Sequence, residues 1–127
     1  MSHLRFLKVE IKNPVPSILE MVINDIVKLY NGYRVNTVRD ASGRTMGVQF
    51  GVHIPSINRS VGLVVKDNRL EIVMDTWNVA REKVEEIKTA VQNLYVANAT
   101  VLAMSNLGYA VQNVQAEKGR IVMEVVK

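Results

Sequence analysis

The sequence contains no cysteine, only two histidines and a single tryptophan. The absence of cysteine excludes disulfides, thiolate zinc sites, iron–sulfur ligation and cysteine nucleophiles. His3 and His53 are the only sources of imidazole, which argues against a histidine-rich metal site or a histidine-based catalytic centre. We therefore expect no cofactor and no metal.

A long hydrophobic run is also missing. The most apolar stretch, residues 94–104, is interrupted by Asn98 and Thr100, whereas a membrane-spanning helix needs about 20 apolar residues. The first twelve residues alternate charged and apolar side chains and do not form the core of a signal peptide. We expect a cytoplasmic protein without a membrane segment.

The residues that are present describe an ordinary globular domain. Hydrophobic residues make up 48% of the chain and charged residues 22%, which argues against disorder. A length of 127 residues corresponds to one domain, residues 1–127.

The amino-terminal segment predicts a strand followed by a helix. Residues 7–12 alternate apolar and charged side chains, as in a half-buried strand. The helix that follows extends to about Tyr30. Its start has two interpretations: Asn13 is the N-cap, or Ser17 and Glu20 form a capping box.

The middle of the chain predicts four strands, over residues 33–39, 46–54, 59–66 and 69–74. Asp67-Asn68 separates the last two strands and is typical of a tight hairpin turn. Gly47 and Gly51 share one face of their strand. They indicate a twist or bulge or, alternatively, a place where a partner approaches closely.

The segment after these strands predicts a long helix over about residues 78–107, ended by Gly108. Its first half is amphipathic, and its second half is apolar nearly all round. Such a surface favours wide burial or a subunit contact. The candidate self-association residues are Leu94, Tyr95, Val101 and Leu102.

The chain closes with a second predicted hairpin, over residues 109–114 and 120–126. Strands joined by tight turns imply an antiparallel sheet, and two amphipathic helices imply one covered face. The prediction is an α+β fold, a single antiparallel sheet with two helices on one face, in the order β-α-β-β-β-β-α-β-β.

Short sequences at the element boundaries occur in the order seen in a known family: Met1-Ser2-His3, Gly32-Tyr33, Val52-His53-Ile54-Pro55, Gly62, Tyr95 and Gly108-Tyr109. In this layout the chain resembles the family of unknown function named after hypothetical chloroplast open reading frame thirty-five. The resemblance covers most of the chain and implies the same fold. It implies no reaction, because the family has no established activity. Members of the family often carry several aromatic residues before the long helix, where this chain has only Trp77. They also often end in a basic–aromatic tail, where this chain ends in Val125-Val126-Lys127.

The charge of +4 is concentrated in one region. Residues 32–70 carry six basic and two acidic groups, and the flanking segments are close to neutral. A basic sheet face of this kind can follow a phosphate backbone, although single-strand recognition usually adds stacking aromatics. The candidate anion or nucleic-acid face consists of Arg34, Arg44, Gln49, His53, Lys66 and Arg69.

Catalytic motifs are not found in the sequence. Glu82, Glu85 and Glu86 cluster on the long helix beside basic residues, which favours a solvated face over an acid–base pair. The sequence has no phosphate-binding loop and no nucleophile elbow. We expect a non-enzymatic protein-interaction domain that forms a homo-oligomer, most simply a dimer, or binds another protein. The alternative is a nucleic-acid or anion-binding module that uses residues 32–70.

Overall fold

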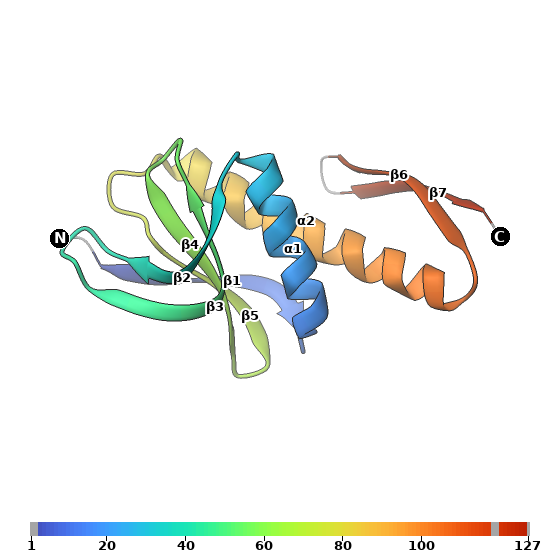
Figure 1. The fold of residues 1–127 in the computed structure, drawn as a ribbon, viewed down its shortest axis with the longest axis horizontal. Helices are drawn as coiled ribbons and strands as arrows, with labels where there is room; N and C mark the ends of the chain where they lie inside the picture. Colours follow the sequence, from blue (N-terminus) through green and yellow to red (C-terminus); the bar gives the residue numbers. More distant parts are fainter. Residues whose placement is uncertain (1–2, 118–119, 127) are drawn as a thin grey trace.

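The computed structural model describes residues 3–117 and 120–126. Within them the chain forms β1 Leu4–Lys12, α1 Pro16–Leu29, β2 Tyr33–Arg39, β3 Thr45–Ile54, β4 Arg59–Lys66, β5 Arg69–Asp75, α2 Arg81–Asn106, β6 Ala110–Glu117 and β7 Arg120–Val126 (Figure 1). The order of elements is the predicted one, and the α+β class is confirmed.

Five strands form one antiparallel sheet in the order β1-β5-β4-β3-β2. Strands β2 to β5 are successive hairpin neighbours, and β1 pairs with β5 at the edge. Asp67 and Asn68 have φ values of 51° and 61°, which the predicted tight turn requires. The last hairpin, β6–β7, forms a separate two-stranded sheet, so the structure has two sheets where the sequence predicted a single one.

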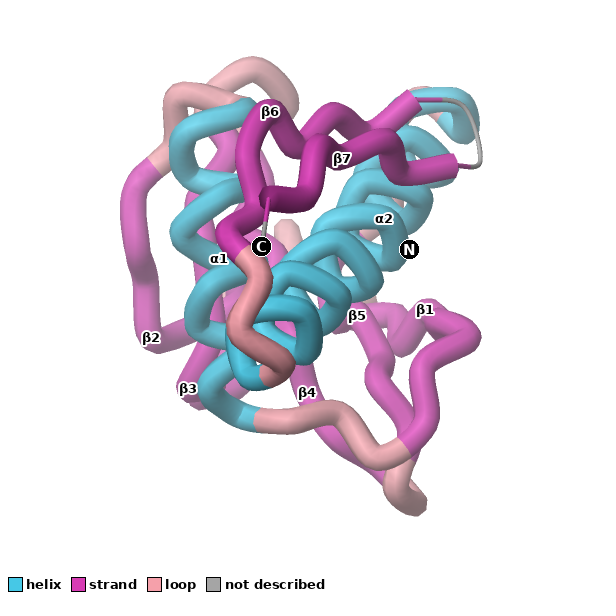
Figure 2. Tube along the Cα trace, turned by 90° about the vertical axis from the view of Figure 1, so that its right-hand side faces the viewer, coloured by secondary structure: helices cyan, strands magenta, loops and turns pink. Residues whose placement is uncertain are grey.

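Both helices cover the same face of the five-stranded sheet, as Figure 2 shows. The interface is built from aliphatic side chains of both layers that are withdrawn from solvent, including Leu19, Ile23 and Ile26 of α1, Leu63, Leu70 and Ile72 of the sheet, and Ile87 of α2. Burying each side chain of this size contributes about 1.5–3 kcal/mol. This layer is the main hydrophobic core.

Neither predicted start of α1 is correct. Val15 precedes the helix in an extended conformation, Pro16 occupies the first turn, and no side chain caps the helix. Asn13 has a positive φ of 51° and donates its amide to the carbonyl of Asn68 at 2.6 Å. The amide of Val15 donates to the hydroxyl of Tyr95 at 2.8 Å. Tertiary contacts, rather than a local motif, therefore fix where α1 begins.

Helix α2 starts later than the predicted residue 78, because Asn78 has a positive φ of 59° that a helix cannot contain. It then continues without a break for 26 residues. Gly108 has a φ of 88° and donates its amide to the carbonyl of Ser105, as predicted for the residue that ends the helix. Within the described ranges, no helix combines the length and apolarity needed to cross a bilayer.

Strand β3 contains a bulge that curls the β2–β3 hairpin over the uncovered face of the sheet. Val35 pairs with Gly51 and Thr37 with Gly47, so β3 has two extra residues between these pairs. The extra residues let Val48 join a second, smaller core on that face, which also contains Val38 and Val73. The bulge interpretation of the glycines is thus correct for Gly51.

Candidate functional site

The predicted basic face is not a single surface. Arg34 donates to the side chains of Glu20 and Asn24, both on α1, so it lies on the side of the sheet that carries the helices. His53 instead packs against the ring of Tyr33, with 5.1 Å between ring centroids. Tyr33 and Arg34 are consecutive in a strand and therefore point to opposite faces. The prediction that Arg34 and His53 share one face is wrong.

The other predicted members lie apart from His53. Lys66 and Arg69 face each other at the β4–β5 turn, at the opposite end of β4 from Ser60, the partner of His53. Arg44 belongs to the β2–β3 turn, and Gln49 is exposed on β3, where its carbonyl accepts a hydrogen bond from Arg34. These positions do not form one continuous anion-binding surface.

A cavity of about 530 Å³ lies on the face of the sheet that the helices leave open. Its floor is a row of residues from four adjacent strands: Tyr33 of β2, His53 of β3, Ser60 of β4 and Asp75 of β5. His53 Nδ1 lies 3.0 Å from Ser60 Oγ, so the two side chains are hydrogen-bonded. Residues 39–41 and 58–59 form the walls.

The wall formed by residues 39–41 is held over the sheet by Asp75. This side chain is completely buried, and its Oδ2 accepts the amide of Ala41 at 2.8 Å. Its Oδ1 accepts the amide of Trp77 at 2.9 Å, just beyond the end of β5. One carboxylate therefore connects the β2–β3 turn with the segment that leads to α2.

Asp40 organises the same turn from within. Its Oδ1 accepts hydrogen bonds from the hydroxyl and the amide of Ser42, at 2.6 Å and 3.0 Å, and from the amide of Arg44 at 2.9 Å. These hydrogen bonds, that from the Ser42 hydroxyl foremost, lower the pKa of Asp40. The carboxylate is therefore ionised at neutral pH.

Two polar atoms beside the cavity are buried without a hydrogen-bond partner among the described residues: Oδ2 of Asp40 and Nε of Arg59. The remaining guanidinium nitrogens of Arg59 donate to the carbonyls of Asn58 at 3.0 Å and Trp77 at 2.7 Å. Buried polar atoms without partners are uncommon and often occur where a water or a ligand binds.

The sequence indicated only His53 among the residues of this site. Asp40 resembles an ordinary turn residue, Arg59 the first residue of a strand, and Asp75 the end of an apolar strand. They come together only because the bulge in β3 curls the β2–β3 turn back to β5. Strand β5 is buried from Leu70 to Asp75 and carries two carboxylates, Glu71 and Asp75, so its sequence does not single out Asp75.

The described residues contain no group of three histidine or carboxylate side chains placed to hold a metal ion. The glutamates of α2 lie on an exposed surface. There Glu86 accepts a hydrogen bond from the Tyr30 hydroxyl at 2.7 Å and pairs with Lys83 at 3.2 Å. The Tyr30 hydrogen bond lowers the pKa of Glu86, and burial raises that of Tyr30. This pair joins α1 to α2.

The predicted self-association residues are more buried than expected. Tyr95 is only 8% exposed, and its hydroxyl is the acceptor for Val15, so it belongs to the core and is not available to a partner. Leu94 and Leu102 pack against the same core and are half-buried, as is Val101. The prediction is wrong for Tyr95.

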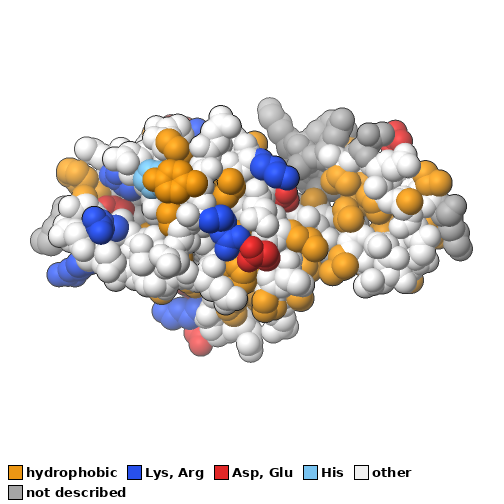
Figure 3. All heavy atoms as spheres, viewed as in Figure 1, with side chains coloured by type: hydrophobic (Ala, Val, Ile, Leu, Met, Phe, Trp, Pro, Cys, Tyr) orange, Lys and Arg blue, Asp and Glu red, His pale blue; other side chains and the backbone are white. Residues whose placement is uncertain are grey.

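Other apolar side chains, at the carboxyl-terminal end of α2 and on the hairpin β6–β7, are exposed instead. Val96 on α2 is 45% exposed and Leu107 at its end is 69% exposed. The hairpin adds Val114, Val122, Val125 and Val126. In Figure 3, hydrophobic side chains are visible over the end of the molecule that carries the hairpin, and the basic ones are scattered over the rest of the molecule.

The fold and the cavity together define an α+β protein with a helix-covered antiparallel sheet and a curled edge hairpin. No family model, curated protein or solved structure matches the chain. The resemblance to the chloroplast reading-frame family stays a prediction.

Proposed function

We propose that this protein is a non-enzymatic interaction domain that self-associates through a distal surface. This distal surface comprises the carboxyl-terminal half of α2, from Val96 onward, and the hairpin β6–β7. The observation that carries the proposal is the position of the hairpin. It packs on α2, away from the five-stranded sheet (Figure 1).

The hairpin supports the proposal because it has apolar side chains on both faces. Val125 and Val126 are both exposed, and consecutive residues of a strand point to opposite sides. Helix α2 can cover only one of these sides. An isolated two-stranded hairpin is marginally stable in water. A second copy of the chain would cover the side that α2 leaves open.

The charge distribution also favours an apolar contact. No charged residue occurs between Lys88 and Glu117, a stretch that includes most of α2 and most of β6. Burying this uncharged stretch against a partner desolvates no charge, and desolvation is the main cost of burying charged groups; the charges of the distal surface are confined to the end of β6 and to β7. A two-fold dimer would use the same patch on both copies.

The test is the oligomeric state of the full chain, measured by light scattering during size exclusion over a range of concentrations. The wild type is expected to be a dimer. Leu107→Glu is expected to weaken the dimer at least about tenfold, because it places a charge in an apolar contact. Its side chain is largely exposed, so the substitution leaves the monomer folded.

Val65→Glu is the matched control, because Val65 is also an apolar, exposed side chain but lies on β4, outside the distal surface. It should leave the dimer unchanged. A wild type that remains monomeric at high concentration would refute the proposal. Equal weakening by both variants would refute the assignment of the contact to the distal surface.

A further inference from the structure

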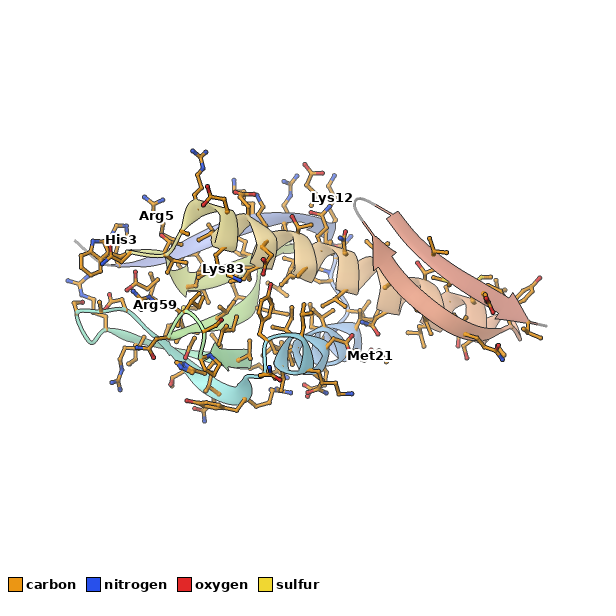
Figure 4. The ribbon with its side chains drawn as sticks, turned by 90° about the horizontal axis from the view of Figure 1, so that it is seen from above. His3, Arg5, Lys12, Met21, Arg59 and Lys83 are labelled. Carbon is orange, nitrogen blue, oxygen red and sulfur yellow. The ribbon has the colours of Figure 1, made fainter. Side chains whose placement is uncertain are left out.

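The cavity on the open face of the sheet has the features of a ligand site and is separate from the distal surface. Figure 4 shows Arg59 among the strands, at the end of the molecule that carries His3 and Arg5, with the hairpin β6–β7 at the opposite end. A volume of about 530 Å³ falls within the usual range of small-molecule sites. The cavity can therefore be occupied independently of self-association.

The floor of the cavity provides an aromatic surface. The ring of Tyr33 is 56% exposed and lies at 30° to the ring of His53. The hydrogen bond between His53 and Ser60 fixes the orientation of the imidazole. A flat ring that stacks on such a surface would bind regardless of its exact substituents, because every heterocyclic base has a π-face.

The walls provide charges of both signs. Arg39 is exposed and makes no ion pair within the described part of the chain, and Arg59 bonds only to main-chain carbonyls. Asp40 and Asp75 are buried beside them. Oδ2 of Asp40 is an acceptor without a partner, and Nε of Arg59 is a donor without a partner. The matching ligand carries an anionic group and also N–H donors.

We propose that this cavity binds a nucleotide unit, either a free nucleoside monophosphate or one nucleotide of a single strand. A nucleotide combines a flat ring for Tyr33, N–H donors for the carboxylate wall and a phosphate for the arginines. The base stacks on the Tyr33–His53 surface. The phosphate lies on the side of Arg39 and Arg59.

The test is a titration of the full chain with AMP, with GMP, with adenosine and with a short single-stranded RNA. The backbone amide shifts of Ala41, Ser60 and Trp77 report on binding by NMR. Shifts confined to the cavity are expected. Tyr33→Ala should lower the affinity for every one of these ligands at least about fivefold, the lower end for loss of one stacked base. Arg39→Glu should weaken AMP but not adenosine.

Two exposed residues outside the cavity give matched controls. Phe6→Ala removes a half-exposed aromatic ring of β1, and Arg69→Glu reverses a charge at the far end of β4–β5. Neither should change the affinity. If Arg69→Glu weakens AMP as much as Arg39→Glu does, the interaction is a general charge effect and the proposed site is wrong.

The arms of the titration also distinguish the two sources of the nucleotide. An RNA that binds much more tightly than AMP identifies a single strand as the ligand, and equal affinities identify the free nucleotide. If no ligand shifts these resonances at about 5 mM, a concentration above the dissociation constants of typical ligands, the proposal is overturned. These results do not depend on the oligomeric state of the protein.

Discussion

The two ends of this molecule are stabilised in different ways. The body, formed by the five-stranded sheet, α1 and the first half of α2, closes its main core with side chains from the sheet and from both helices. The distal end, formed by the rest of α2 and the hairpin β6–β7, leaves Leu107 and several valines exposed. The comparison teaches that the body buries its apolar side chains within one chain, whereas the distal surface leaves apolar side chains exposed that a second surface could cover.

The largest effect is expected from cavity formation in the body. Ile72→Ala removes a completely buried side chain from β5 and should lower the free energy of unfolding by about 2–5 kcal/mol. Leu107→Ala in the distal end should change it by less than about 0.5 kcal/mol, as is usual for exposed positions. Urea unfolding at a concentration where the protein is monomeric measures both. Equal losses would show that the two ends do not differ as described.

A smaller effect is expected from the glycines of β3, which test the curl of the β2–β3 hairpin. A Cβ at Gly51 would lie 2.6 Å from the carbonyl oxygen of Val35, a main-chain atom that cannot move aside easily. Gly51→Ala should therefore cost about 1–3 kcal/mol of stability. A Cβ at Gly47 meets nothing within 4 Å, so Gly47→Ala on the same strand should be neutral or slightly stabilising.

These two variants should also separate stability from the shape of the cavity. Because the bulge positions the β2–β3 turn, Gly51→Ala is expected to shift the amide resonances of Ala41 and Ser42, and Gly47→Ala is not. If Gly47→Ala destabilises the protein as much as Gly51→Ala does, close packing at the bulge is not the cause of the loss of stability.

The smallest effect is expected from acid. The pKa of Asp40 is lower in the folded protein than in the unfolded chain, so folding favours the ionised form. Its contribution is complete above the unfolded value of about 3.9 and is lost as the pH falls through the folded value. The stability difference between wild type and Asp40→Asn, measured by urea unfolding, should therefore narrow from about pH 7 to about pH 3.

Glu10→Gln is the control for this pH dependence, because it removes an exposed carboxylate of the same body. Its difference from the wild type should stay nearly constant over that range. If the stability difference between wild type and Asp40→Asn widens toward low pH, the pKa of Asp40 is not lowered in the folded protein.

Most elements of the fold were predictable because their signals are local. The Asp67-Asn68 turn and the Gly108 helix end depend on residues that tolerate a positive φ, and both adopt it. The start of α1 was not predictable, because the partner of its first amide is Tyr95, on the other helix. The same contact explains why Tyr95 was wrongly assigned to an exposed surface.

The cavity could not be predicted for a related reason. Its residues are spread over four strands and two turns, and a bulge of two residues in β3 decides which of them meet. Alternation in the sequence assigns faces only while the register is regular. Alternation also does not show which residues of two strands pair, and the pairing of Tyr33 with His53 puts Arg34 and His53 on opposite faces.

The strand order has a consequence for how the chain assembles. β1 is synthesised before the other four strands of its sheet, yet the strand it pairs with in the described structure is β5, whose residues lie more than fifty positions further along. Until β5 exists, Leu7, Val9 and Ile11 have no sheet to join, and afterwards the edge of β5 stays open until β1 arrives. The interval between these events is when a nascent chain exposes an unpaired edge to its neighbours, the arrangement most prone to aggregation.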